Sequence, residues 1–335
     1  MTSHDRRSAL KLSLGAVGLL ALPQVTEFAR AAEDFIRGPR IKDHPIKQLS
    51  KHVWMIYSPD GFPTPENRGM MANVIFVVTS AGVVVIDSGA SLQIGQMAIR
   101  MIRKVTDKPV VAVFNSHYHG DHWLGNHAFV KTYGDKLPIY ALPSTIEKLK
   151  GAEGNLWRSL MERWTNQSTL GTQVVLPNTP VQHGQVLQFG DVSFRLHHYG
   201  TAHTPSDLCV EVVQDKVTAL GDIAMTNRIA NMDEGSYPGT FKYYKALQAA
   251  TGDQLWVPGH GQARKDLLKT YGEFMAGIWE PCLKAVEDGK SEAEAKAAVL
   301  KDPRVASRAK TMQGYEGNIG KYISLAYLEA EKVAF

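Results

Sequence analysis

The sequence has few cysteines, no apolar run long enough to span a membrane and no strongly charged segment. Only Cys209 and Cys282 occur among 335 residues, which excludes a fold held together by several disulfides. The apolar stretch Leu12–Leu22 is too short for a membrane-spanning helix, which needs about 20 residues. The net charge is +4, and no basic cluster interleaved with aromatic residues occurs. Nucleic acid is therefore not an expected partner.

What the sequence does contain is material for a large core. Hydrophobic residues make up 44% of the chain, and its length fits either two domains or one large α/β domain. Cys209 lies within an apparent strand, Leu208–Val213. We therefore expect two separate buried thiols, with a disulfide in an oxidising compartment as the alternative.

The N-terminus resembles a twin-arginine export signal. Arg6 and Arg7 precede the apolar stretch, with Lys11 close behind, and Ala29-Arg30-Ala31 offers the small residues that a signal peptidase reads. We expect residues 1–31 to be a signal peptide recognised by the twin-arginine machinery, so that the mature protein works in a bacterial periplasm. An amphipathic helix or a membrane anchor is the alternative.

The segment HYHGDH, which starts at His117, is the most informative part of the chain. It places three imidazoles and one carboxylate in six positions, directly after Val110–Phe114, a short β-branched run that predicts a buried strand. Neutral imidazole and ionised carboxylate suit zinc or iron. One turn can direct His117 and His119 at one metal, while Asp121 and His122 point to a neighbouring position. A polar loop with accidental histidines is the alternative.

Three further acidic or imidazole side chains follow apolar stretches in small, glycine-containing contexts: His203, Asp222 and His260. Each pattern predicts a strand, a tight turn and an exposed ligand, which would bring the side chains to one edge of a sheet. Asp87, in the segment VIDSG, also follows an apolar run.

Taken together, these five motifs resemble the metallo-β-lactamase superfamily, over about Ile41–Arg264. The resemblance implies two adjacent metal sites formed by His117, His119 and His203 at the first, Asp121, His122 and His260 at the second, and Asp222 as a bridge. It implies two zinc ions per chain, with iron as an alternative, and a bridging water or hydroxide as the nucleophile, since zinc lowers the pKa of water to about 7. Asp121 would also hold the proton of that hydroxide.

The role of Asp87 has two interpretations that are not exclusive. As an outer-shell partner it would orient a ligating imidazole, and such partners typically matter 10–100-fold. Alternatively, Asp87 turns the chain out of its strand and caps the helix that follows.

The whole pattern predicts an α/β fold, the αββα sandwich of the metallo-β-lactamases, with an all-helical C-terminal extension. We expect a catalytic domain at residues 40–264 and the extension at residues 265–335. Strands are expected at 52–57, 73–78, 83–86, 110–114, 174–176, 186–189, 192–197, 208–213, 216–220 and 255–257. Helices are expected at 91–105, 145–165 with a break near Gly151, 240–251, 267–285, 291–300 and 317–332. The extension is expected to pack on the sandwich, and dimerisation or shaping of the cleft is the alternative.

The sequence predicts a reaction type but no specific substrate pocket. A flap at Ser58–Met70 and an apolar wall of Trp157, Trp164 or Tyr237 are candidates for contact with a small-molecule substrate. For each of these aromatic residues, packing in the core is the favoured alternative. The leading hypothesis is a dinuclear zinc hydrolase acting on an ester, thioester, lactone or amide. The chain most resembles the periplasmic zinc metallohydrolases associated with quinoprotein and sulfur-oxidation systems. The features that carry this resemblance are the export signal, the Ala202-His203 and Gly221-Asp222 pairs and the helical C-terminal extension.

Three alternatives stay open. True β-lactamases usually have Cys or Ser where Asp222 stands, so only promiscuous β-lactamase activity is expected. A mononuclear iron persulfide dioxygenase would use the His117, His119 and His203 site. A non-catalytic metal-binding accessory of a quinoprotein or sulfur-oxidation system would keep the ligands without turnover.

Overall fold

The computed structural model describes residues 37–226, 228–229 and 231–334. The expected signal peptide at residues 1–31 lies outside the described residues. Within the described part of the chain, no helix combines the length and the apolar character needed to cross a membrane.

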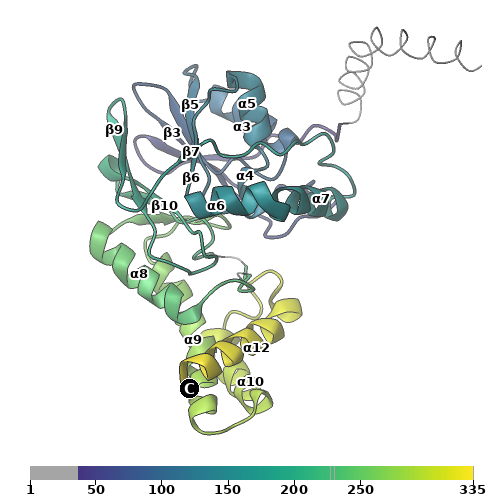
Figure 1. The fold of residues 1–335 in the computed structure, drawn as a ribbon, viewed down its shortest axis with the longest axis vertical. Helices are drawn as coiled ribbons and strands as arrows, with labels where there is room; N and C mark the ends of the chain where they lie inside the picture. The colour runs from purple at the N-terminus through teal and green to yellow at the C-terminus, as the bar shows by residue number, and fades with distance from the viewer. Residues whose placement is uncertain (1–36, 227, 230, 335) are drawn as a thin grey trace, which may run out of the picture.

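Two β-sheets form the centre of the upper part of the molecule as drawn in Figure 1, above the C-terminal helices. The first sheet has the strand order β1 (Ile46–Gln48), β2 (Val53–Ile56), β3 (Val74–Val78), β4 (Val83–Ile86), β5 (Val110–Phe114), β6 (Ile139–Ala141), β7 (Thr179–Pro180). Its neighbours are antiparallel from β1 to β4 and parallel from β4 to β7. The second sheet has the order β12 (Leu255–Val257), β11 (Val217–Ala219), β10 (Cys209–Val212), β9 (Val192–His197), β8 (Val186–Phe189), with only β11 and β12 parallel.

A buried apolar layer joins the inner faces of the two sheets. Met55 and Phe114 of the first sheet belong to the same core cluster as Phe194 and Val210 of the second. Side chains alternate between the faces of a strand, so the remaining apolar residues of the same strands reach the outer faces.

Helices cover both outer faces. α3 (Leu92–Arg103) and α5 (Asn126–Tyr133) pack on the first sheet, while α8 (Tyr237–Thr251) and α9 (Leu267–Glu287) pack on the second. α3 begins at Ser91, whose side chain accepts a hydrogen bond from the amide of Ile94, a standard N-cap. These layers confirm the predicted αββα sandwich.

The segment after β6 forms a bent helical arm. α6 (Pro143–Lys148) runs into a π-helical turn, η1 (Leu149–Glu153), and then into α7 (Gly154–Trp164). The backbone leaves helical geometry at Gly151, where ψ is −145°. The predicted break near Gly151 is therefore confirmed.

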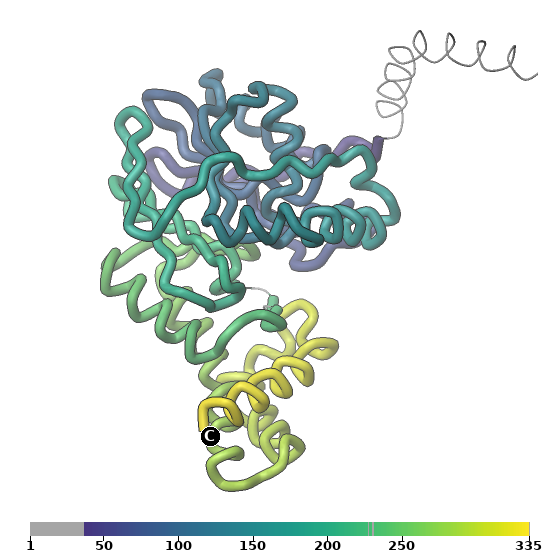
Figure 2. Tube along the Cα trace, viewed as in Figure 1, coloured from purple at the N-terminus to yellow at the C-terminus, as the bar shows by residue number. Residues whose placement is uncertain are grey.

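The chain beyond the sandwich is helical, as predicted. α9 is followed by α10 (Glu292–Lys301), α11 (Pro303–Ala306) and α12 (Tyr315–Ala334), which form a compact group away from α3 and α5 (Figure 2). Trp256 of β12 and Leu247 of α8 share one hydrophobic cluster with residues of α9 and α12. The division into residues 40–264 and 265–335 stays a prediction, and a continuous core crosses that boundary.

The structure differs from the predicted strands at several places. Residues 174–176 are not a strand: Val174, Val175 and Leu176 pack on the cluster under the first sheet without a pairing partner, so packing explains their apolar character. The short strands β1, β6 and β7 were not expected. Cys209 and Cys282 are both buried free cysteines, which confirms two separate thiols.

Candidate metal centre

Seven side chains from four separate segments of the chain meet at one edge of the sandwich. They form two groups that share Asp222: His117, His119, His203 and Asp222 in the first, and Asp121, His122, Asp222 and His260 in the second. Within each group the candidate ligand atoms all lie within 4.8 Å of one another. All are buried except His119, which is partly exposed. The structure therefore brings together every residue that the sequence nominated as a ligand.

Tight turns place these side chains. His117 follows the end of β5, and the one-turn helix α4 (Gly120–Trp123) begins directly after His119. The turn before His260 contains Gly259, where an added Cβ would lie 2.2 Å from Oδ1 of Asp222. Only glycine fits at this position, because any side chain would occupy the space of the shared carboxylate.

Asp222 lies between the two groups. Its Oδ2 is 3.2 Å from Nε2 of His260 and 3.8 Å from Nε2 of His203. Its Oδ1 is 3.3 Å from Nε2 of His122. One carboxylate thus faces imidazoles of both groups, as a bridging ligand must.

Four of these converging polar atoms are buried without a hydrogen-bond partner in the described chain: His117 Nε2, Asp121 Oδ2, His122 Nε2 and Asp222 Oδ1. A buried polar atom without a partner costs about 1–3 kcal/mol, so four such atoms in one place require an explanation. Converging imidazole nitrogens and carboxylate oxygens are the donor set of zinc and related divalent ions. The residues present therefore fit metal ions.

Burial and charge divide the imidazoles into two classes. Burial lowers the pKa of all three imidazoles of the first group, His117, His119 and His203, the last to about 4. Burial acts in the same direction on His122 and His260, but the surrounding carboxylates outweigh it and raise their pKa values. For Asp121 and Asp222, burial is outweighed by the neighbouring imidazoles, which lower the pKa of both carboxyls. Neutral imidazoles are thus favoured at His117, His119 and His203, whereas the carboxylates favour positive charge beside them, at His122 and His260.

Asp87 contacts an imidazole of the second group. Its Oδ2 lies 2.8 Å from Nδ1 of His122 and accepts a hydrogen bond from Oγ of Ser116, while its Oδ1 accepts one from the Ser116 amide. Its φ of +58° is a left-handed conformation that is rare for a residue other than glycine. The orienting interpretation is thus supported by geometry. Capping of the following helix is performed by Ser91 instead.

A cleft of about 350 Å³ opens over the two groups. Trp157 and Trp164 line it, and the Trp157 ring lies 4.8 Å from the ring of His119. Phe62, from the expected flap, lines the same cleft. Tyr237 does not line it, because its side chain is buried in the core next to α9 and α12. The extension also reaches the cleft, through Asn318, Lys321 and Tyr322 of α12.

A model of the metallo-beta-lactamase superfamily matches residues 67–271, more than half of the chain. The chain belongs to this superfamily. With its cluster of histidines and aspartates, it is a metal-dependent hydrolase that binds divalent metal.

Known relatives agree with this assignment. A type 2 metallo-beta-lactamase of Bacillus sp. (strain 170) is 25% identical over 221 residues, covering 65% of this chain and 76% of the relative. The type 2 enzyme of Bacillus cereus is 25% identical over 223 residues, with the same coverage. A solved metallo-beta-lactamase from Pontibacter korlensis has a TM-score of 0.55 at 17% identity, covering 69% of this chain and 98% of that one. That likeness concerns the fold, and roughly a third of this chain has no counterpart in it.

Two residues that contact the candidate ligands were not predicted from the sequence. Asp207 accepts hydrogen bonds from the amides of Ala202, His203 and Thr204, and so fixes the turn that carries His203. The turn-forming sequence around it was an available signal. Arg228 is 8% exposed and places Nη1 3.2 Å from Nε2 of His260. No local pattern marks it, because its position depends on distant segments.

Proposed function

We propose that this protein is a dinuclear zinc hydrolase that attacks a carbonyl group of an ester, thioester, lactone or amide. The observation that carries the proposal is Asp222, one buried carboxylate shared by two groups of ligand atoms. Two complete groups favour two metal ions over the single iron of a dioxygenase, because the second group would otherwise remain unsatisfied.

Each side chain would have a distinct role. His117, His119 and His203 would hold the first ion, and Asp121, His122 and His260 the second, with Asp222 between them. When bound, two such ions supply a hydroxide nucleophile at neutral pH and polarise the carbonyl. Asp121 would hold the proton of the nucleophile, and Asp87 would keep the His122 ring in its ligating orientation through the 2.8 Å contact with Nδ1.

Promiscuous β-lactam hydrolysis is a second candidate, favoured by the names of the two Bacillus relatives. Asp222 argues against a dedicated β-lactamase, because the resemblance to the superfamily implies Cys or Ser at this position in true β-lactamases. We propose that β-lactams are at most slow substrates.

The proposed place of action is the bacterial periplasm, reached by twin-arginine export of the precursor. This proposal rests on Arg6 and Arg7 ahead of the apolar stretch. We also propose that the protein is one of the periplasmic zinc metallohydrolases associated with quinoprotein and sulfur-oxidation systems. Replacing both arginines by lysine is expected to retain the precursor in the cytoplasm. Normal export of that variant, measured by cell fractionation, would exclude the route.

Metal analysis of the mature protein combined with a hydrolysis screen tests the proposed reaction. We expect two zinc per chain and metal-dependent turnover of at least one ester, thioester, lactone or amide. One iron per chain with oxygen uptake in the presence of a persulfide would replace the hydrolase by the dioxygenase. Full metal loading without turnover of any substrate would indicate the accessory role.

A further inference from the structure

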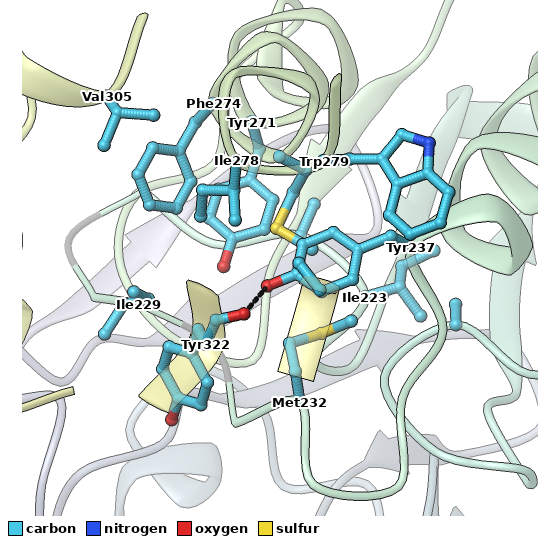
Figure 3. Close-up of a cluster of buried hydrophobic side chains, with 14 of the residues drawn as sticks. Ile223, Ile229, Met232, Tyr237, Tyr271, Phe274, Ile278, Trp279, Val305 and Tyr322 are labelled. Carbon is cyan, nitrogen blue, oxygen red and sulfur yellow. Dashed lines mark hydrogen bonds between the residues drawn. The ribbon is translucent and has the colours of Figure 1, made fainter. Parts of the chain in front are cut away.

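The candidate ligands of the second group are held in place by different parts of the molecule. The segment that follows Asp222 enters the hydrophobic core of the C-terminal extension. Figure 3 shows Ile223 of this segment gathered with Tyr237, whose hydroxyl donates to the Tyr322 carbonyl at 3.0 Å. His260 is held in addition by a segment of the sandwich, residues 71–73, which joins the end of the flap to β3.

The carbonyl of Met71 orients the imidazole of His260. Nδ1 of the ring lies 2.8 Å from this carbonyl oxygen. A carbonyl can only accept, so Nδ1 carries the hydrogen, and in the neutral ring the lone pair is then on Nε2. Nε2 is the atom that faces the Oδ2 atoms of Asp121 and Asp222, at 3.1 and 3.2 Å. The ring therefore presents its lone pair to the centre of the group, as a metal ligand must.

Asn73 fixes the turn that carries this histidine. Its Nδ2 donates to the carbonyl of Pro258 at 3.0 Å and to that of Gly261 at 2.9 Å. Its backbone amide donates to the carbonyl of Gly259 at 2.7 Å. Asn73 is 1% exposed, so these hydrogen bonds are made without competition from solvent. One buried residue thus bonds the chain on both sides of His260.

The same carboxamide closes the base of the flap. Its Oδ1 accepts a hydrogen bond from the amide of Ser58 at 3.0 Å, and the Ser58 hydroxyl donates to the carbonyl of Met70 at 2.8 Å. Ser58 and Met70 are the two ends of the flap, and Phe62 within it lines the cleft. Asn73 therefore bonds the flap and the turn of His260 through the two ends of one amide group.

The chemistry of the side chain matters at this position. Two carbonyl oxygens of the turn need hydrogens and the Ser58 amide needs an acceptor, and a carboxamide supplies both donors and the acceptor. A carboxylate of the same shape could still accept from Ser58, but it would face both turn carbonyls without a hydrogen to donate. Such a mismatch is costly in a buried network.

We propose that Asn73 is the positioning residue of His260 and couples the flap to metal binding at the second group. A metal ion that fixes His260 also restrains the flap, and a restrained flap favours binding of that ion, because coupling between two sites is reciprocal. The first group is independent of Asn73, since none of its three histidines lies on this turn. This inference rests on the proposed dinuclear function.

Stepwise zinc affinities of the purified protein, measured by chelator competition, test the positioning role. Asn73→Asp keeps the acceptor for Ser58 but loses both donors to the turn. We expect it to weaken binding of the second zinc equivalent by about 10- to 100-fold, the range typical of residues that orient a ligand, and to leave the first unchanged. Asn73→Ser adds no charge and retains one donor, so it should show the same split with a smaller loss, and it replaces Asn73→Asp if that variant fails to fold.

Gln254→Glu is the matched control. Gln254 is another buried carboxamide, 4% exposed, whose Nε2 donates to the carbonyl of Thr251 at 2.9 Å and whose Oε1 accepts from the Thr218 hydroxyl at 3.1 Å. It precedes β12, whereas the turn of His260 follows that strand. The same change from amide to carboxylate should therefore destabilise the fold without separating the two zinc affinities.

Hydrogen exchange of the flap amides, residues 58–70, followed by mass spectrometry, tests the coupling. In the unmodified protein the second zinc equivalent should slow this exchange. In Asn73→Ala, which lacks the side-chain bonds to both segments, it should have no effect. A residue with a purely structural role would change flap exchange equally with and without zinc.

Two zinc affinities that fall together in Asn73→Asp, as in a general loss of packing, would overturn the proposal, and so would an unchanged second affinity. Binding of a single zinc equivalent by the unmodified protein would overturn both this proposal and the proposed function. A protein that shows the split yet hydrolyses no ester, thioester, lactone or amide would refute the proposed reaction alone.

Discussion

The sandwich and the C-terminal helices contribute to the same cleft in different ways. The sandwich supplies all seven candidate ligands, each at a turn that follows a strand or a short apolar run. The helices supply none of them, but they line the cleft through α12 and hold the segment after Asp222 in their core.

We therefore expect the sandwich to determine metal binding and the reaction, and the C-terminal helices to influence which molecules bind in the cleft. Changes at the candidate ligands of the sandwich should alter metal content and turnover together, because the ligand atoms converge on a shared carboxylate. Changes in the extension should alter which molecules bind, with metal content preserved. Four variants test this difference between the two regions, and they are given in order of decreasing expected effect.

Asp222→Ala should have the largest effect. Removing the carboxylate shared by both groups is expected to lose one metal equivalent and most turnover, measured by elemental analysis and by the rate on the best substrate. Asp266→Ala, at an exposed aspartate paired with Arg264, is the matched control. Unchanged metal stoichiometry in Asp222→Ala would show that this residue is not a bridge.

Asp87→Asn should weaken metal binding without removing a ligand. The amide cannot accept from His122 and Ser116 as the carboxylate does, so the His122 ring loses its fixed orientation. We expect metal affinity to fall about 10- to 100-fold in a chelator competition. Affinity equal to that of the unmodified protein would reduce Asp87 to a residue that merely shapes its turn.

Trp157→Ala tests the wall supplied by the helical arm. Loss of the indole should raise KM by about tenfold through lost apolar contact, with metal content unchanged. Leu156→Ala is the control on the same helix, because that side chain is 47% exposed and lies outside the cleft. A fall in kcat alone would mean that Trp157 supports His119 rather than the substrate.

Gly314→Ala should have the smallest effect on the reaction and a measurable one on folding. The backbone at this position has a positive φ, and an added Cβ would clash with the Phe62 ring. We therefore expect a loss of about 1–3 kcal/mol in the free energy of unfolding. Gly317→Ala, in α12 with open space around it, should stabilise by about 0.5–1 kcal/mol. Denaturant unfolding of both variants measures the contrast, and equal midpoints would contradict the described packing.

The ligand set was predictable because each ligand lies in a short motif whose meaning is local. HYHGDH begins three residues after the end of β5, and the turn containing Gly259 admits no side chain beside Asp222. Short apolar, β-branched runs likewise predicted most of the strands, and the resemblance to the superfamily implied their arrangement in two sheets. Such signals need only the immediate neighbours of a residue.

Features that depend on distant segments were not predictable in this way. β6 and β7 are three and two residues long and form only because the preceding strand offers a partner. Arg228 and Gln313 meet through the packing of the extension on the sandwich. The sequence does not show whether Tyr237 lines the cleft or lies in the core, because this depends on the position of α12.

The cluster that runs from β12 through α8 into α9 and α12 has a practical consequence for anyone who wishes to shorten this enzyme. A chain ended after residue 264 would keep every candidate ligand, yet it would leave Tyr243, Leu247 and Trp256 without the helices that cover them. Such a trimmed version is expected to aggregate during expression rather than yield a smaller hydrolase.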